Sequence, residues 1–158
     1  MVELIPMNEL EFEMYLQYNM QEYAQGQEES RHTAHEAAEE EAERQYHQLL
    51  PQGLATPDHT LCMIFDPKRA KNVGVLWFDQ RQEQGEKQVF LNDIVIFEEF
   101  RRRGYARLAM QELETRARGL GAASIGLHVS AQNEAAHLLY EKLQYAVAEM
   151  NNHLSKRL

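Results

Sequence analysis

The sequence predicts an α/β domain in which helices flank a mixed β-sheet. Two helix-like stretches come first and three strand-like stretches follow, after which the chain alternates helix, strand, helix, strand. The length of 158 residues is typical of one domain, and 44% apolar with 26% charged residues is typical of a globular protein. We therefore expect a single domain over residues 1–158, built on one continuous core.

The N-terminal part is expected to be extended at first and then helical. Residues 2–6 have an extended pattern. Asn8 and Glu11 have the spacing of a capping box, which predicts a helix that begins there and fades near Gly26. The Ala- and Glu-rich stretch 33–50 predicts a second helix.

The rest of the chain alternates between strand and helix patterns. Short runs rich in β-branched and aromatic residues predict strands, and the third of these runs is mostly apolar, so we expect it in the centre of the sheet. A polar turn around Gly85 should separate the second run from the third. The expected elements are strands over 60–65, 72–78 and 88–97, a helix over 105–118, a strand over 124–129, a helix over 133–143, and one or two edge strands after Tyr145.

Charge is distributed unevenly along the chain. Residues 1–60 hold 13 acidic and two basic residues, whereas residues 61–158 hold 12 acidic and 14 basic ones. The basic part is suited to an anionic ligand, and the acidic part to a cationic one. Taken alone, the run from Glu36 to Glu43 is more simply a solvated helix face.

Composition also excludes several classes of protein. The net charge of -9 argues against a nucleic-acid binder, which needs a basic face. No run of ~18 apolar residues predicts a membrane span, and the N-terminus lacks the basic and apolar regions of a signal peptide. Cys62 is the one cysteine, so no intramolecular disulfide can form. We expect a cytoplasmic protein without membrane or nucleic-acid partners.

A basic loop carries the first functional signal. The apolar strand around Ile94 leads into Arg101-Arg102-Arg103-Gly104, and a helix pattern follows from Tyr105. The unpaired N–H groups and the dipole at a helix start bind phosphate, and glycine allows close approach of the anion. One glycine does not make a dinucleotide fingerprint, and no Gly-Lys-Ser/Thr follows as in a P-loop. By itself the loop is more simply an ordinary connection with basic surface residues.

A second motif makes the signal specific. The loop pattern Arg101-x-x-Gly104-x-Ala106 is followed, after the next strand, by Asn133-x-x-Ala136-x-x-x-Tyr140. This pair of motifs at this spacing resembles the GNAT family of acetyl-CoA-dependent N-acetyltransferases, clearly over residues 88–147 and more loosely over 1–87. The resemblance implies the GNAT fold. In that fold a mixed sheet of six to seven strands is flanked by about four helices and is splayed between its two central parallel strands.

The resemblance also implies how acetyl-CoA is held. Residues 88–147 would form the acetyl-CoA-binding core, and the acidic helical region 1–60 would lie on the acceptor side. The pantetheine arm would pair with backbone groups along the central strand, and the last helix, which Asn133 caps, would contact the same arm. The diphosphate would lie on the basic loop. The residues matched in this way are Ile94, Val95, Ile96, Arg101, Arg102, Arg103, Gly104, Tyr105, Ala106, Arg107, Asn133, Ala136 and Tyr140.

Tyr140 matches the tyrosine that acts as general acid in the family. The coenzyme leaves as a thiolate, and a free thiol has a pKa near ~8.5, so a hydroxyl beside the sulfur can donate a proton or a hydrogen bond. Without the family pattern, Tyr140 is more simply a core residue on the apolar face that Ala136 and Leu143 also occupy.

Two residues are candidates for the base that deprotonates the amine. His128 is the first, because an imidazole with an ordinary pKa near ~6.5 suits proton abstraction at neutral pH. Strand alternation places His128 on the face opposite Leu127 and Val129, so a histidine that merely pairs across the sheet is the simpler alternative. Asp93 is the second candidate. Many members of the family carry Glu-Asp where this chain has Asn92-Asp93, and the missing glutamate weakens that case.

The resemblance predicts an acetyltransferase that acts on a primary amine by direct attack on acetyl-CoA. The acidic N-terminal region favours a small cationic amine or a peptide N-terminus as the acceptor. No metal is expected, since the order of His32, His35 and Glu36 does not fit a zinc motif. Dimers are frequent in the family, so a homodimer is compatible with this prediction. An idle acetyl-CoA-binding sensor and an unrelated phosphate-binding α/β domain are the alternatives.

Overall fold

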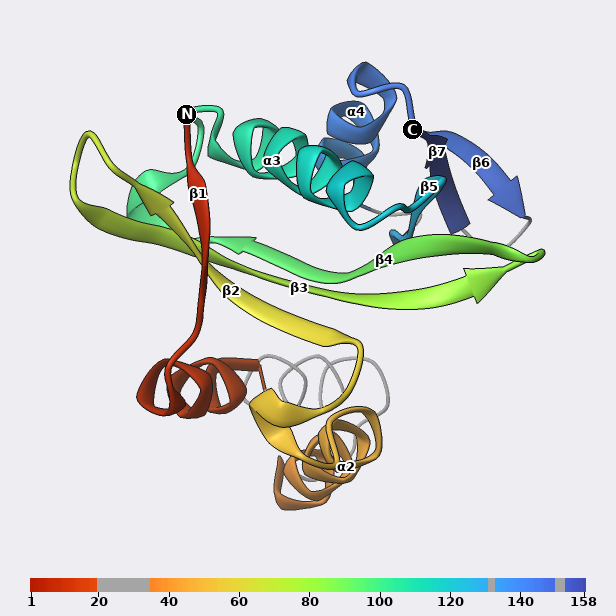
Figure 1. Cartoon of the computed structure of the whole chain (residues 1–158). Helices are drawn as coiled ribbons and strands as arrows, with labels where there is room; N and C mark the ends of the chain where they lie inside the picture. The colour runs from red at the N-terminus through yellow and green to blue at the C-terminus, as the bar shows by residue number, and fades with distance from the viewer. Residues whose placement is uncertain (20–34, 131–132, 150–152) are drawn as a thin grey trace. The chain divides into compact units, whose positions relative to one another are not determined.

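A computed structural model describes residues 1–19, 35–130, 133–149 and 153–158. The chain forms two compact units, residues 7–59 and residues 1–6 together with 60–158. The second unit contains the sheet that the sequence predicts (Figure 1). No helix among the described residues is both long enough and apolar enough to cross a bilayer.

Seven strands form one mixed sheet in the order β1-β2-β3-β4-β5-β7-β6. The central strand is β4, as its apolar composition predicts. It pairs antiparallel with β3 and parallel with β5. The last strand, β7, lies between β5 and β6, so only β6 is the edge strand that the sequence predicts for the tail. The strands are β1 (Glu3–Pro6), β2 (His59–Asp66), β3 (Lys71–Glu83), β4 (Glu86–Ile96), β5 (Ser124–His128), β6 (Ala146–Glu149) and β7 (His153–Arg157).

The strand β3 is longer than predicted. The sequence indicates a strand over 72–78 and then a polar turn, but β3 continues to Glu83, and a tight turn at Gln84 and Gly85 joins it to β4. Both turn residues have positive φ, which matches a two-residue hairpin turn. The polar residues after Phe78 stay in the strand because they pair along β4 and with one another, as Asp79 and Arg81 do.

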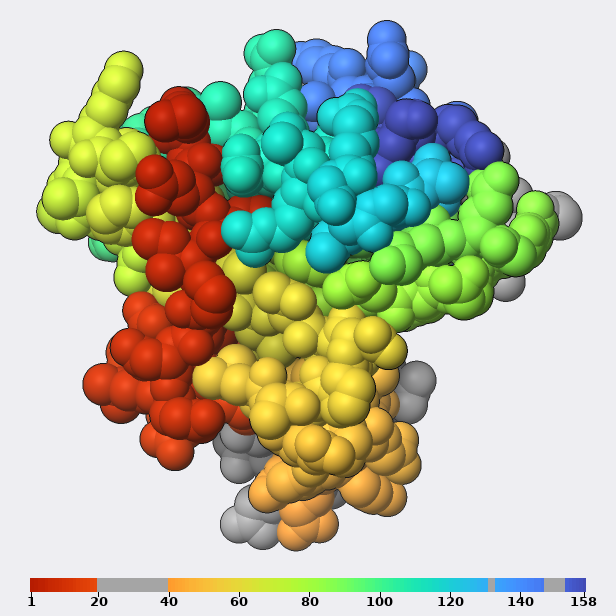
Figure 2. All heavy atoms as spheres, viewed as in Figure 1, coloured from red at the N-terminus to blue at the C-terminus, as the bar shows by residue number. Residues whose placement is uncertain are grey.

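Two helices pack their apolar sides against one core. The helix α3 (Tyr105–Gly119) contacts β1, β4 and β5. Its neighbour β1 lies beside it in Figure 2, and the Arg116 guanidinium donates to the Leu4 carbonyl at 2.9 Å. The helix α4 (Glu134–Lys142) adds Tyr140 to the same core. The core also contains Cys62, which is fully buried as expected of a small apolar residue.

The unit formed by residues 7–59 is helical. Residues 9–19 form a helix whose capping box is as the sequence predicts: Asn8 N donates to Glu11 Oε1 at 3.0 Å, and Glu11 N donates to Asn8 Oδ1 at 2.8 Å. The second helix is α2 (His35–Leu49), and a short 3-10 turn, η1 (Gly53–Ala55), follows it. The predicted end of the first helix near Gly26 lies outside the described residues.

The C-termini of α3 and α4 end in the same backbone motif with different residues. After α4, Tyr145 N donates to Tyr140 O at 2.9 Å and Gln144 N donates to Glu141 O at 3.0 Å. These two bonds define a Schellman motif. After α3 the same bonds run from Ala122 to Ala117 and from Gly121 to Arg118, both at 3.0 Å. The left-handed position is held by Gly121 after α3, with φ 83°, but by Gln144 after α4, with φ 70°.

This difference predicts that Gln144→Gly stabilises the protein. A side chain in the left-handed conformation costs roughly 1–2 kcal/mol, part of which the greater freedom of glycine in the unfolded chain offsets. We expect a gain of about 1 kcal/mol in the free energy of unfolding, or about 3 °C in Tm. The reciprocal variant Gly121→Gln should lower stability by a similar amount. Thermal unfolding of both variants checks this, and a Gln144→Gly variant less stable than the parent contradicts it.

Candidate functional site

The strand β4 loses one of its two partners halfway along. Its pairing with β5 covers Gln88 to Leu91 and then ends, although β4 continues to Ile96. The pairing with β3 shifts at the same point: Phe78 pairs with Leu91 and Trp77 with Asp93, so Asn92 is an extra residue, a β-bulge. From Asn92 to Ile96 no described residue of β5 pairs with β4, so this stretch of its β5-facing edge is open, apart from the Ile96 carbonyl, which accepts from Arg101. This is the splay that the family resemblance implies.

The basic loop leads from this open strand to α3. A short 3-10 turn, η2 (Glu98–Phe100), precedes it, and the side chain of Arg101 reaches back so that its Nε donates to the Ile96 carbonyl at 2.9 Å. Arg102 and Gly104 have φ of 63° and 81°, which lets the chain reverse direction into the helix. Gly104 is the N-cap residue of α3, and no side chain caps the helix. The first amides of α3 are therefore left for a ligand.

A pocket lies beside the basic loop. Its volume is about 460 Å³, and Lys68, Arg69 and Arg103 bring three cationic side chains to it. The Tyr105 hydroxyl donates to Asp66 Oδ2 at 2.5 Å within the same lining. This hydrogen bond raises the pKa of Tyr105 and lowers that of Asp66. The sequence predicts a role for the backbone of Tyr105 but misses this side-chain contact, since nothing in the spacing links residues 66 and 105.

The helix α4 presents Tyr140 to the core. Asn133 caps it as predicted, with its Oδ1 accepting from Ala136 N at 3.1 Å. Tyr140 is buried, with 5% of its surface exposed, and its ring meets that of Tyr145 edge to face at 5.7 Å between centroids. Burial raises the pKa of Tyr140 to about 12, and the charge of Asp93 adds to the effect. The charge of Asp93 thus acts on Tyr140, so two of the three predicted catalytic residues lie within electrostatic range of each other.

The third predicted catalytic residue, His128, is exposed on β5, while Leu127 and Val129 on either side of it are buried. This confirms the alternation that the sequence predicts. The ring of His128 contacts the rings of His153, at 4.8 Å between centroids, and Phe90, at 5.6 Å. His128 thus belongs to a cluster of rings across β4, β5 and β7.

A polar network next to the bulge is missed by the sequence analysis. Asp79, which is buried, accepts two hydrogen bonds from the Arg81 guanidinium, at 2.9 and 2.7 Å, and one from Asn92 Nδ2 at 2.9 Å. The Arg81 guanidinium lies 3.8 Å from the centre of the Phe90 ring, a cation–π contact. The network ties the bulged residue to β3. The sequence signal for this network is the alternation of polar residues after Phe78, but the same pattern is equally typical of a turn.

Other candidate residues contribute no site in the described ranges. No group of three or more His, Cys, Asp or Glu side chains there is placed to hold a metal ion. His32 lies outside the described residues. Burial raises the pKa of the Cys62 thiol, which makes a nucleophilic thiolate harder to form.

Comparisons with known proteins agree on one family. The model of the acetyltransferase (GNAT) family matches residues 13–145. Two Bacillus subtilis proteins described as uncharacterized N-acetyltransferases are each 33% identical to this chain: YycN, over 99% of both chains, and YdgE, over 91% of both. The crystal structure of YycN covers 95% of both chains with a TM-score of 0.84 and 31% identity. PaiA N-acetyltransferase from Thermoplasma acidophilum, solved with coenzyme A, shares the fold, with a TM-score of 0.73, 14% identity and coverage of 100% of this chain and 99% of that one.

The environment of Tyr140 predicts its titration. Its phenol should stay protonated to a pH of about 12, because burial and the charge of Asp93 both disfavour the phenolate. In Asp93→Asn the second cause is removed, so the pKa should fall, while burial keeps it above the ordinary value of about 10. Ultraviolet absorbance after rapid pH jumps, taken as the difference between each protein and its Tyr140→Phe form, isolates this tyrosine. A step near pH 10 in the parent protein would contradict the assignment.

Proposed function

The chain belongs to the acetyltransferase (GNAT) family, and from this premise we propose that it transfers an acetyl group from acetyl-CoA to a primary amine. One observation carries the proposal: beyond Leu91 the β5-facing edge of β4 is open, and the chain runs on from this strand through the basic loop into the uncapped start of α3.

The residues present fit acetyl-CoA as the acetyl donor. A pantetheine arm carries amide groups. The open edge of β4 from Asn92 to Ile96 offers backbone partners for these amides, so the arm can pair with β4 as an additional strand would. A diphosphate fits the first amides of α3, where no side-chain cap and no acidic first-turn residue competes. Lys68, Arg69 and Arg103 supply positive charge in the adjacent pocket. The bound thioester supplies the activated acetyl carbonyl.

Residues of the chain would then stabilise the negative charge on the carbonyl oxygen and accept the proton that the amine loses. A backbone amide around Val95, such as that of its neighbour Ile94, which faces the open edge, would donate to the carbonyl oxygen as negative charge develops there. The amine nitrogen attacks the carbonyl carbon, the carbon–sulfur bond breaks, and the amine loses one proton. His128 and Asp93 are the two candidates to take that proton, directly or through a water.

The pKa of Tyr140 defines its part in the reaction. A phenol with a pKa of about 12 is a weaker acid than a thiol with a pKa near 8.5, so full proton transfer to a thiolate would be uphill. The useful contribution is a hydrogen bond to the sulfur while its charge develops. Because the phenol stays protonated throughout the physiological range, this donor is always available.

The acceptor is expected to carry positive charge. Residues 1–60 have a large excess of carboxylates, and the family resemblance implies that this acidic region lies on the acceptor side. A negative potential attracts cationic molecules and raises their rate of encounter. A small polyamine-like amine, an amino sugar or a peptide N-terminus fits this requirement.

The variant Tyr140→Phe tests the proposal. Removing one hydrogen-bond donor to a developing charge typically costs 10²–10³ in rate, so kcat for amine acetylation should fall by about that factor. Calorimetric titration should give the same micromolar affinity for acetyl-CoA in both proteins, since the phenol acts after binding, and no binding of ATP. Release of free thiol, with cationic amines as acceptors, measures kcat.

The outcomes separate the proposal from its rivals. Binding of acetyl-CoA without turnover of any amine would indicate an acetyl-CoA-binding module rather than an enzyme of this kind. Equal binding of ATP and acetyl-CoA would indicate a general phosphate site. An unchanged kcat in Tyr140→Phe would remove Tyr140 from the mechanism while leaving the transferase assignment intact.

A further inference from the structure

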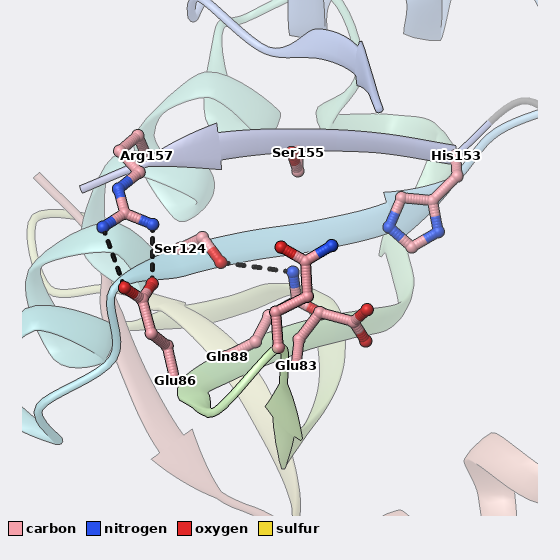
Figure 3. A pocket seen from close by; sticks show the side chains of 8 residues that line it. Glu83, Glu86, Gln88, Ser124, His153, Ser155 and Arg157 are labelled. Atoms are coloured by element: carbon pink, nitrogen blue, oxygen red, sulfur yellow. Dashed lines mark hydrogen bonds and ion pairs between the residues drawn. The ribbon is translucent and has the colours of Figure 1, made fainter. Parts of the chain in front are cut away.

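The sheet face that points away from α3 carries a polar pocket. Lys156 of β7 points to α3, where its Nζ donates to Glu114 at 2.6 Å, so its neighbours Ser155 and Arg157 lie on the other face. There they meet β4 and β5 side chains around a cavity of about 310 Å³ (Figure 3). A volume of this size is at the lower end of small-molecule sites.

The floor of the pocket is Gln88, a buried side chain with an unused acceptor. Only 4% of Gln88 is exposed, and its Nε2 donates to Ser124 Oγ at 3.2 Å. Its Oε1 has no hydrogen-bond partner among the described residues and is itself covered, so the side chain must turn for a ligand in the pocket to reach this oxygen. Such a buried oxygen, left without a donor, destabilises the folded protein. A ligand that donates a hydrogen bond in the pocket would remove that destabilisation.

Gly126 makes room for this arrangement. A Cβ at Gly126 would lie 3.0 Å from Gln88 Nε2 and 3.1 Å from both Cδ and Oε1. The Gln88 amide therefore packs against Gly126 of β5, and any larger residue at position 126 would displace it. Because Gly126 is flanked by buried Ile125 and Leu127, the space is a feature of the sheet itself rather than of a loop.

The charges around the pocket favour a cation. Glu86 and Arg157 form a two-point ion pair, at 2.6 and 3.2 Å, and largely cancel each other at one end (Figure 3). Glu83 makes no salt bridge within the described part of the chain, and its carboxylate remains available to the cavity. His153 lines the other end and contacts the ring of His128. A donor group with positive charge suits both Glu83 and the Gln88 oxygen.

We propose that this pocket binds a second ammonium group of the acceptor, with its N–H donating to Gln88 Oε1 and its charge facing Glu83. The inference rests on the proposed function, because the first amine must react at the open edge of β4. Gln88 lies four residues before Asn92, where that edge begins, which is about 13 Å along a strand. Phe90 lies between the two points in β4, and its ring contacts the rings of His128 and His153. The acceptor class is therefore a linear molecule whose two amino groups are about 13 Å or more apart.

Kinetics with linear diamines tests the inference. We expect kcat/KM to rise with the length of the diamine. Once the two nitrogens can span about 13 Å or more, kcat/KM of the diamine should exceed that of the monoamine of equal length. The ratio of the two kcat/KM values, taken for the diamine with the highest kcat/KM and the monoamine of equal length, should fall at least tenfold in Glu83→Gln and in Gln88→Met. Glu83 is exposed, so its substitution does not threaten folding. Glu141→Gln, an exposed substitution of the same charge outside the pocket, should keep the parent ratio.

Two results would overturn the inference. One is a parent enzyme that gives no advantage to diamines of any length, and the other is an advantage that survives both pocket substitutions. If no amine is acetylated at all, the proposed function fails, and nuclear magnetic resonance decides the pocket separately. Titration with diaminodecane should then still shift the side-chain amide signals of Gln88 in a saturable way, and their failure to shift would rule the site out.

Discussion

The end of the pairing between β4 and β5 is the constraint on which the candidate site depends. At Asn92 an extra residue enters β4 opposite Trp77, and from that point no described residue of β5 pairs with this edge of the central strand. Exposed backbone groups in the middle of a sheet are costly unless a partner meets them. A ligand with amide groups of its own is such a partner. The network of Asp79, Arg81 and Asn92 holds the bulge in place, which makes the gap a fixed feature of the fold.

Tyr140 is positioned by the two ends of a nine-residue helix. Asn133 fixes where α4 begins, and the Schellman motif at its other end brings Tyr145 against the Tyr140 ring. Burial in this setting raises the pKa of the phenol, and Asp93, from the bulged segment, acts in the same direction. The two ends of α4 therefore set the position of Tyr140 and, through its burial, the pKa of its phenol. A substitution at Gln144 acts on Tyr140 through the backbone hydrogen bonds at the end of the helix.

Much of this architecture could be read from the sequence. The Asn8 and Glu11 spacing, the apolar central strand and the single glycine before α3 each act locally, so the residues themselves reveal the structure. The bulge at Asn92 and the position of β7 inside the sheet depend on pairing between distant segments, which no local pattern records. The pocket at Gln88 was missed for the same reason: it requires Gly126 beneath the amide, 38 residues away in the chain.

Hydrogen exchange of backbone amides, with and without acetyl-CoA, tests the account most directly. The amides of Ile94 and Ile96, which face the open edge, and those at the start of α3 after Gly104 have no backbone partner among the described residues and should exchange quickly. On addition of acetyl-CoA they should become protected together, while amides from Gln88 to Leu91, already paired with β5, should change little. Binding of acetyl-CoA that leaves the exchange of residues 92–96 unaltered would contradict the account.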